Sequence, residues 1–521
     1  MSDSRKKNYL KGATILAFGG IMAKFLGMFL KIPLNRTIGE LGMGLYANAY
    51  PVYTFLLAIS TIGLPVAISK MVSERLKLGQ YDAAYKVFRV AVTTLAVIGA
   101  ICTAIMLFGA NFFIRTFNWH PDTYYSIMGL ALAPFFVCIL SSFKGFFQGM
   151  QNMTPSSISQ IVESFTRVVV GLALAIFLFN RLGVAYGAAG ATFGATAGAF
   201  MASLFMFICY LRVAPGIKKN ISRQEEKHEE EVGKILKILA SIAIPITLAS
   251  LVTSSMNLIN SFTVSHYLQV IGFSVDEATI LWGQLSQKAQ VIISIPVVLA
   301  SSLAASLVPT ISESHVVGNN EDIVKKTYIA MKVLFLITLP CMVGLVVLPG
   351  EILTLLFGNP NGYNMLRMLA LGLLFTMIST SMQGILQGLG KVNIPVRNLG
   401  IGCIIKLILN VILIQIPKLN IYGAILGTLG ADLVVSSLDF GAVRKYTKGS
   451  YAGLIGAFLR TLACALAMGA CCYGVKVALM PVIGNALTTV VAIFISIVVY
   501  GALVYFTKTL DIKEVKSVTG R

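Results

Sequence analysis

The chain has 521 residues, of which 56% are hydrophobic and only 12% are charged. Soluble globular proteins carry about a quarter charged residues, so this composition and a mean hydropathy of +0.82 exclude a soluble domain and indicate a polytopic membrane protein. The net charge of +20 does not indicate nucleic-acid binding, because no basic-aromatic motif accompanies it and the cations gather in alternate loops. Membrane topology and attraction to anionic lipid headgroups explain it better.

Fourteen apolar stretches are long enough to cross a hydrocarbon core of about 30 Å, which requires roughly 20 residues. All fourteen should be helices, because lipid leaves the backbone no other partner and the stretches lack the alternation of barrel strands. They lie at about 11–37, 46–72, 85–112, 124–149, 156–180, 184–211, 235–268, 281–314, 325–350, 363–389, 394–416, 421–447, 452–480 and 484–507.

A polar, charged segment after the sixth stretch divides the chain. We expect an N-lobe of six helices at 1–212, a cytoplasmic linker at 213–234 and a C-lobe of six helices at 235–448. Two further helices and a tail follow at 449–521. The first apolar stretch is too long for a signal peptide and lacks a cleavage site, so it should remain as a helix. The positive-inside rule places both termini and the linker in the cytoplasm.

The two lobes are predicted to be copies of one unit. Ser73-Glu74 and Gly79 recur 239 positions later as Ser312-Glu313 and Gly318, and Gln148-Gly149 recurs as Gln387-Gly388. So long a period indicates a duplicated multi-helix unit, from which many secondary transporters are built. Such lobes can rock to expose a binding site to either side of the membrane.

The first stretch contains two lysines, Lys24 and Lys31, which lie seven residues apart and therefore on one helical face. A charge inside a membrane helix is costly unless it faces a water-filled space or a partner. We expect Lys24 to face such a space. Lys31, with Arg36, lies near the outer surface, so snorkelling to the interface is an equal alternative for it.

Other charges inside the apolar stretches are further candidates. Glu163 and Arg167 are one helical turn apart, so they form either a structural ion pair or a ligand or coupling-ion site. Lys406 occupies nearly the place of Arg167 in the second copy, and Asp432 is a candidate coupling residue there. Lys288 lies on a polar face of the eighth stretch, where it could meet the lysines of the first.

Some charged residues carry no predicted role. Glu74, Arg75, Lys144 and Glu313 lie toward the expected cytoplasmic ends of their stretches, where solvation explains them. Asp439, seven residues after Asp432, either forms an acidic pair with it or faces cytoplasmic water. The eight cysteines and four histidines show no metal-ligand spacing, so a metal site is not expected.

Three glycines recur every fourth residue in the sixth stretch, namely Gly190, Gly194 and Gly198. They form a flat strip on which another helix can approach closely, which is more often a packing device than a functional one.

Three runs resemble a known group of membrane proteins. Ala23-Lys24-Phe25-Leu26-Gly27, the run LYANAYPVYTF at 45–55, and Phe147-Gln148-Gly149-Met150 closely resemble the stage V sporulation protein B group. That group belongs to the MurJ-like polysaccharide-biosynthesis flippases of the multidrug/oligosaccharidyl-lipid/polysaccharide exporter superfamily, which includes the MATE transporters. The resemblance covers nearly the whole chain. It implies a fourteen-helix, two-lobe protein of the bacterial cytoplasmic membrane that flips undecaprenyl-pyrophosphate-linked sugars, above all lipid II.

The resemblance carries over to single residues only in part. It implies that Lys24 fills the place of a basic residue that lines the cavity. Lys31 is one position out of register with a second such residue, and Lys288 is an approximate match to a third. The acidic residue that the family places early in its second helix falls near Tyr46 here. A mechanism that requires that carboxylate therefore lacks it in this chain.

Two other classes of function remain open. A MATE-type drug or cation antiporter would be expected to present acidic residues to its substrate, whereas the deep charges here are mostly basic and favour an anionic substrate. A membrane-embedded glycosyltransferase would need paired carboxylates or a metal and large polar loops, so an enzyme is not expected. We expect no cofactor, a lipid-linked oligosaccharide and membrane lipids as partners, and a monomer. The coupling ion (H⁺ or Na⁺) or the use of the membrane potential stays open.

Overall fold

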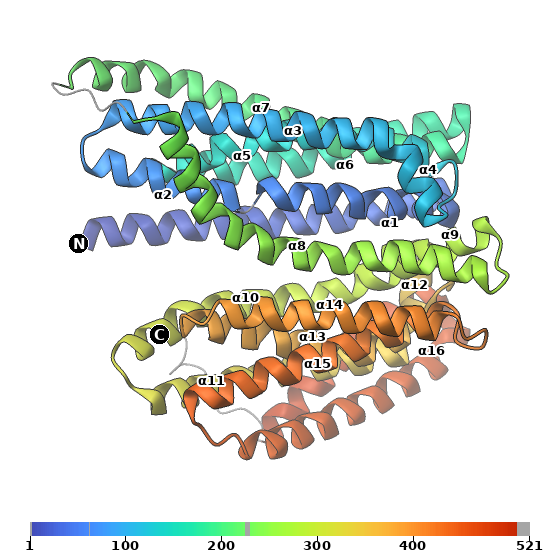
Figure 1. Ribbon diagram of the computed structural model, residues 1–521. Coiled ribbons are helices and arrows are strands. Elements are labelled where there is room, and N and C mark those ends of the chain that lie inside the picture. Colours follow the sequence, from blue (N-terminus) through green and yellow to red (C-terminus); the bar gives the residue numbers. More distant parts are fainter. Residues whose placement is uncertain (1–2, 62, 225–229, 508–521) are drawn as a thin grey trace. The chain divides into compact units, whose positions relative to one another are not determined.

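The structure is a computed structural model that describes residues 3–61, 63–224 and 230–507. Within the first helix, it describes the side chains of residues 19, 20, 22, 23 and 25–59. Every regular element in the described ranges is a helix (Figure 1).

The first half of the chain forms nine α-helices. Their bounds are α1 (Asp3–Thr61), α2 (Gly63–Lys77), α3 (Tyr81–Phe117), α4 (Thr123–Leu130), α5 (Ala133–Gly149), α6 (Thr154–Leu182), α7 (Val184–Ser222), α8 (Val232–Val270) and α9 (Val275–Gly283).

The second half begins with a π-helical turn and continues with seven α-helices. Their bounds are η1 (Gln284–Ala289), α10 (Gln290–Val316), α11 (Asn320–Val347), α12 (Pro349–Phe357), α13 (Tyr363–Gly388), α14 (Asn393–Ile414), α15 (Ile421–Thr447) and α16 (Gly453–Phe506).

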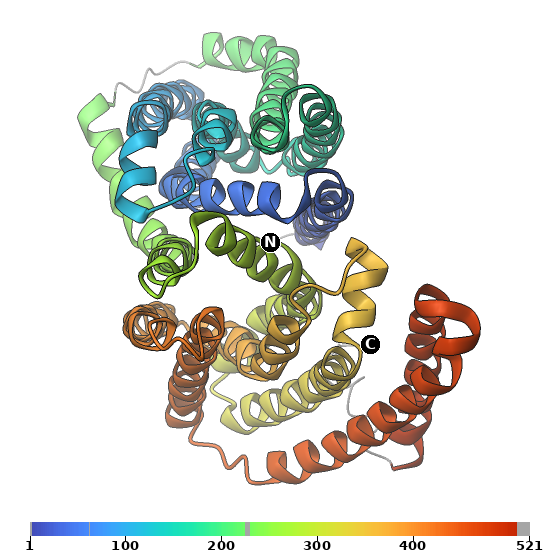
Figure 2. The same cartoon turned by 90° about the vertical axis from the view of Figure 1, so that its right-hand side faces the viewer.

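The described residues contain 12 helical segments long and apolar enough to cross a membrane. Two of the long helices are each interrupted by a glycine with non-helical, positive-φ geometry: Gly39 in α1 (φ 69°, ψ −174°) and Gly484 in α16 (φ 73°, ψ 172°). Only glycine adopts such φ values readily. The chain doubles back within α1 in Figure 1 and within α16 in Figure 2. Each of these two helices therefore supplies two spans, which brings the 12 segments to about fourteen. The predicted all-α polytopic membrane fold is confirmed.

The contacts divide the chain into two compact units. The first unit comprises Met1–Gln269 and Phe273–Gly283, and the second comprises Val270–Gly272 and Gln284–Arg521. Grouping by contact thus differs from the predicted lobes, because it assigns α8 and α9 to the first unit instead of beginning a new lobe at residue 235. The reason is that the sequence repeat identifies copies, whereas packing decides which helices belong together.

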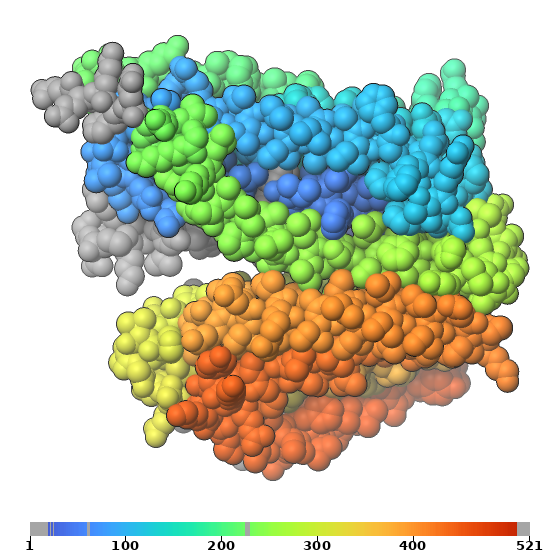
Figure 3. Space-filling model, viewed as in Figure 1, coloured from blue at the N-terminus to red at the C-terminus, as the bar shows by residue number. Residues whose placement is uncertain are grey.

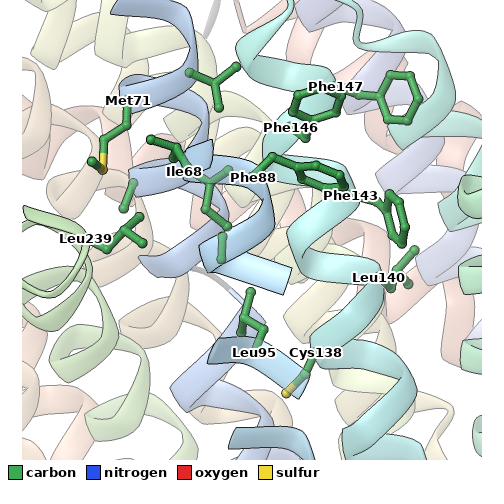
Figure 4. Packing of buried hydrophobic residues seen from close by; sticks show 14 of the residues in the cluster. Ile68, Met71, Phe88, Leu95, Cys138, Leu140, Phe143, Phe146, Phe147 and Leu239 are labelled. Carbon is green, nitrogen blue, oxygen red and sulfur yellow. The ribbon is translucent and has the colours of Figure 1, made fainter. Parts of the chain in front are cut away.

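The core of the first unit joins α2, α3, α5 and the beginning of α8 (Figure 4). Phe88 of α3 stacks on Phe146 of α5, with ring centroids 4.3 Å apart. Ile235, Leu239 and Ala243 of α8 are spaced four residues apart, so they lie on one helical face, and all three are buried in this cluster. Removing this face from lipid and from water ties α8 to the first unit.

The packing of α2 on α5 is repeated in the second unit by α10 on α13. A Cβ atom added to Gly149 would lie 2.7 Å from Cβ of Val72, and one added to Gly388 would lie 2.9 Å from Cβ of Ile311. Gly388 follows Gly149 by 239 positions, and Ile311 follows Val72 by the same 239 positions. The duplication seen in the sequence is therefore a duplication of helix packing.

The predicted glycine strip of α7 does permit a close helix approach, and the neighbour is α6. A Cβ atom on Gly194 would lie 2.6 Å from Cα of Gly171, and one on Gly198 would lie 2.5 Å from the backbone oxygen of Glu163. In the second unit, a Cβ atom on Gly423 of α15 would lie 2.5 Å from the backbone carbon of Leu413 of α14. Backbone-to-backbone contact thus fixes α6, which carries Glu163 and Arg167, and α14, which carries Lys406.

The linker is anchored to the α2–α3 turn. Arg75 is only 8% exposed and donates to Glu230 through Nε (2.9 Å) and Nη2 (2.6 Å). The side-chain oxygen of Gln224 accepts hydrogen bonds from the backbone amides of Tyr81 (2.9 Å) and Asp82 (3.2 Å). The expectation that solvation explains Arg75 was wrong, because its guanidinium is buried in a bidentate ion pair.

Both units contain an apolar pocket. In the first unit, a pocket of about 520 Å³ lies where α3 and α8 border a hollow in Figure 3, and Leu64, Leu95 and Leu239 help to line it. In the second unit, a pocket of about 800 Å³ is lined by residues of α10, α11, α12 and α16, among them Pro296 and Tyr500. No charged residue lines either pocket, so the charges in the spans lie elsewhere.

Candidate functional site

The two lysines of α1 differ in what the structure says of them. The side chain of Lys24 lies outside the described residues. Lys31 is partly buried beside the fully buried Leu30 and Leu34. Within the described part of the chain, no hydrogen bond or ion pair involves Lys31, so its charge is not neutralised by a residue that the structure describes.

The ion pair considered for the fifth stretch is present in α6. Nη2 of Arg167 donates to Oε1 of Glu163 at 2.9 Å. The two side chains are 19% and 18% exposed. A spacing of four residues places both on one face of the helix, and the close contact with α7 holds that face in place.

A third charge joins this pair, and sequence reasoning missed it. Nζ of Lys144, in α5, lies 3.7 Å from Oε2 of Glu163, and the Lys144 side chain is 17% exposed. Solvation at a helix end therefore does not explain Lys144. The turn between Gly149 and Thr154 is short enough to make α5 and α6 a helical hairpin. Counting outward from that turn would have brought Lys144 toward Glu163.

Three tyrosines of α1 extend the cluster. Nη1 of Arg167 donates to the hydroxyl of Tyr50 at 3.2 Å. Tyr46 stacks on Tyr50 at 5.3 Å between ring centroids, and Tyr53 meets Tyr50 edge-on at 5.5 Å. We call Lys144, Glu163 and Arg167 the charge triad, and Tyr46, Tyr50 and Tyr53 the tyrosine row. The acid of this cluster is Glu163 on α6.

The second unit places a cation at the corresponding helix. Lys406 of α14 is 5% exposed, and the carboxylate of Asp432 in α15 attracts it electrostatically. Oγ1 of Thr376 donates to Oδ2 of Asp432 at 2.6 Å. The carboxylate of Asp432 therefore combines a hydroxyl donor and a buried lysine.

Asp439, two helical turns after Asp432 in α15, is fully buried at 0% exposure. It accepts hydrogen bonds from Nδ2 of Asn398 (2.8 Å), Oγ of Ser379 (3.0 Å) and Nε2 of Gln383 (3.4 Å). The suggestion that Asp439 faces cytoplasmic water was wrong. Its polar partners come from α13 and α14, which are distant in sequence, so periodicity could not reveal the burial.

Lys288 lies in the π-helical turn η1 and is 0% exposed. Its Nζ donates to Oδ1 of Asn359 at 2.7 Å and lies 5.9 Å from the ring centroid of Phe357, within cation–π range. π-Helical turns occur frequently at functional sites. The expected meeting of Lys288 with the lysines of α1 stays a prediction.

No set of three His, Cys, Asp or Glu side chains in the described ranges could hold a metal ion. The polar groups described above are cations, carboxylates, amides and hydroxyl groups that bind one another. Such groups can bind and release an anion or a proton.

The sequence matches known families. The profile of a family described as polysaccharide biosynthesis protein matches residues 9–315, and a profile described as MatE matches residues 286–412. The chain is 27% identical over 441 residues to stage V sporulation protein B of Bacillus subtilis (strain 168), covering 84% of each chain. It is 28% identical over 477 residues to the lipid II flippase MurJ of the same organism, covering 88% of this chain and 87% of the relative.

Solved structures share the fold at 16% sequence identity. An inward-facing multidrug resistance MATE family transporter of the MOP superfamily superposes with a TM-score of 0.68, covering 82% of this chain and 94% of the other. Lipid II flippase MurJ in an inward closed conformation superposes with a TM-score of 0.65, covering 95% and 99%. The resemblance inferred from the sequence motifs is confirmed, and the protein belongs to the polysaccharide biosynthesis protein family, as a multi-pass membrane protein with the MATE-like fold.

Proposed function

We propose that the protein is a flippase that moves an undecaprenyl-pyrophosphate-linked oligosaccharide across the cytoplasmic membrane by alternating access. The cargo would be lipid II or a related cell-wall, spore-cortex or polysaccharide precursor. The observation that carries this proposal is the set of cations buried in apolar helices of a member of this family: Lys288 at 0% and Lys406 at 5% exposure, and Arg167 at 19%. Its relatives include a named lipid II flippase and a named sporulation protein.

Electrostatics supports an anionic headgroup. A diphosphate loses its hydration when it leaves water, and cations in a region of low dielectric offset that loss better than cations at a surface. We assign headgroup contacts to Lys24, Lys31, Lys288, Arg167 and Lys406. Lysine binds as a point charge without the bidentate grip of arginine, which favours release.

The remaining roles follow from transport without covalent change. Glu163 and Asp432 are the proposed counter-ions or coupling residues, and H⁺, Na⁺ or the membrane potential supplies the driving force. The proposal needs no cofactor and no catalytic residue. It includes a monomer in contact with membrane lipids, with both termini in the cytoplasm.

A MATE-type drug or cation antiporter is the second candidate. It is favoured by the MatE match over residues 286–412 and by two acids within the helices of the second unit, the half-buried Asp432 and the fully buried Asp439. Both acids are already bound by hydroxyl or amide donors, and Asp432 also has Lys406 to balance it. Cation transport by this route would have to displace those partners.

Depletion of the protein in its own cell tests the proposal. We expect a lipid-linked diphosphate precursor to accumulate in the inner leaflet and Lys24→Arg to restore its export, whereas Lys24→Ala should not restore it at equal expression. Lys70→Ala is the control, because Lys70 is exposed and pairs loosely with Glu74. Normal export by Lys24→Ala would remove Lys24 from the binding site, whereas accumulation of an organic cation instead of the precursor would favour the antiporter.

A further inference from the structure

The charge triad carries more positive charge than its own acid can neutralise. Glu163 divides its two oxygens between two cations, with Oε1 at 2.9 Å from Arg167 and Oε2 at 3.7 Å from Lys144. One carboxylate between two cations leaves a net charge of +1. No further acidic side chain among the described residues forms an ion pair with either cation.

The two contacts of Glu163 differ in strength. The contact with Arg167 has the length of a charge-assisted hydrogen bond, whereas 3.7 Å is too long for a hydrogen bond and leaves the contact with Lys144 mainly electrostatic. Lys144 comes from another helix, α5, while Arg167 shares α6 with Glu163. Lys144 is thus the cation that Glu163 can lose at little cost.

The region also contains donors without a partner. Nε of Arg167 and the hydroxyl of Tyr53 are buried and make no hydrogen bond in the described part of the chain, and Tyr53 is only 1% exposed. Leaving a buried donor unpaired costs about 1–3 kcal/mol. The Arg167 guanidinium acts electrostatically on Tyr53, so both donors belong to one neighbourhood.

The charged heads are only partly shielded. The three side chains are 17–19% exposed, so their charged groups are not sealed inside the protein. Charges on membrane-spanning helices usually face a water-filled space instead of lipid. A small anion can reach them there.

We infer that the charge triad is a phosphate-binding site in which Glu163 is an internal counter-ion that gives up Lys144 to an incoming phosphate or diphosphate oxygen. The inference rests on the proposed function, and it adds Lys144 and this exchange to it. In the empty protein, Glu163 holds the two cations in place. In the loaded protein, the phosphate contacts Lys144 in place of Glu163. The competition lowers affinity, which allows the headgroup to leave at the other side of the membrane.

The test measures binding of inorganic pyrophosphate to the purified full-length protein in lipid nanodiscs by calorimetry. Glu163→Gln keeps the shape and removes the competing charge, so its affinity should rise by about tenfold or more, as expected for a unit charge a few ångströms from the ligand. Lys144→Met should lower the affinity by about tenfold for the same reason. The double variant should bind about as well as the wild type.

The matched controls are Glu74→Gln and Lys70→Met, which alter an exposed pair with the same i, i+4 spacing. They should leave pyrophosphate binding unchanged. If Glu163→Gln does not fold, Lys144→Met alone decides. Unchanged or weaker binding by folded Glu163→Gln, or wild-type binding by Lys144→Met, would overturn the inference and leave a structural ion pair.

Transport of lipid II by wild-type protein in liposomes separates this inference from the proposed function. Transport without tighter binding by Glu163→Gln would remove the exchange and keep the flippase. Tighter binding without transport of any lipid-linked diphosphate would keep the phosphate site and remove the flippase.

Discussion

The two units repeat one scaffold but neutralise their buried charges by different means. In the first unit, Glu163 is balanced by two full charges, Lys144 and Arg167. In the second unit, the position that corresponds to Lys144 in the repeat is Gln383, and it donates to Asp439 as an uncharged amide. Helix packing has therefore been preserved while charge has diverged. The positions of the polar groups are thus shared by the two units, whereas the charge at each position differs between them.

The turns that follow α2 and α10 show the same divergence. Arg75 and Ser314 occupy corresponding positions, 239 residues apart. Ser314 donates to Asp322 at 2.6 Å and accepts from Lys326 at 2.7 Å, both in the helix directly after the turn. Arg75 instead reaches Glu230 in the linker. In the first unit, the residue at this position binds the linker. In the second unit, it binds only the helix that follows the turn.

The packing shared by both units should be the most sensitive to change. Gly198→Leu would drive a side chain into the backbone of α6, so we expect it to cost about 3 kcal/mol or more, at the upper end of overpacking penalties. Gly423→Leu should do the same on α14. Gly216→Leu and Gly441→Leu are the controls. They lie on α7 and α15, as Gly198 and Gly423 do, and a Cβ atom at either position meets nothing within 4 Å. The measurement is the midpoint of thermal unfolding in detergent, and a midpoint for Gly198→Leu equal to that of its control would contradict the repeat in packing.

The two turns should differ next. Arg75→Ala leaves the Glu230 carboxylate partly buried without its two donors and should cost about 2 kcal/mol, whereas Ser314→Ala should cost about 1 kcal/mol, as expected for charged and neutral hydrogen bonds. The double reversal Arg75→Glu with Glu230→Arg should recover part of the loss. Equal losses for Arg75→Ala and Ser314→Ala, with no recovery by the reversal, would show that the linker contact stabilises nothing.

Double-mutant cycles should rank the two charge clusters. Glu163→Gln with Arg167→Met should show a coupling of about 1–3 kcal/mol, because either single change strands a charge near low dielectric. Asp432→Asn with Lys406→Met should show a smaller coupling, about 0.5–1 kcal/mol, because Thr376 still binds the side chain at position 432. Additive losses of stability in the first cycle would show that the Glu163–Arg167 ion pair does not stabilise the unit.

Topology should be insensitive to all of these changes and sharpens the meaning of the repeat. Copies of the same orientation require Asn118 and Asn359 to lie outside the cell and Gln224 to lie inside. In a background without the eight native cysteines, cysteines at the first two positions should react with an impermeant reagent from outside, and one at Gln224 should react only after lysis. External labelling at Gln224 would contradict the fourteen-span order and the assigned location of both termini.

The sequence predicted the spans, the repeat and the Glu163–Arg167 pair, because these depend on composition and on spacing along one helix. It did not predict the roles of Lys144, Arg75 and Asp439. Each of these contacts residues on another segment, and its burial depends on tertiary packing that periodicity does not encode. Lys144 was the most accessible of the three to reasoning, since one short turn joins its helix to that of Glu163. The grouping of helices by contact depends on tertiary packing in the same way, because α8 follows the linker yet packs into the first unit.

The π-helical turn at Gln284–Ala289 has one further consequence. Its hydrogen bonds span five residues instead of four, so each hydrogen-bonded loop there encloses one residue more than in an α-helix. Such a turn is a one-residue insertion that the helix has absorbed without a loop. Residues on its two sides therefore follow different helical registers. An alignment that starts at the prolines of α10 and allows no gap would pair Lys288 with the wrong residue of a related chain that lacks the insertion. Excising one residue from this turn would let the helix close as a regular α-helix, and Lys288 would then turn through about 100° from Asn359.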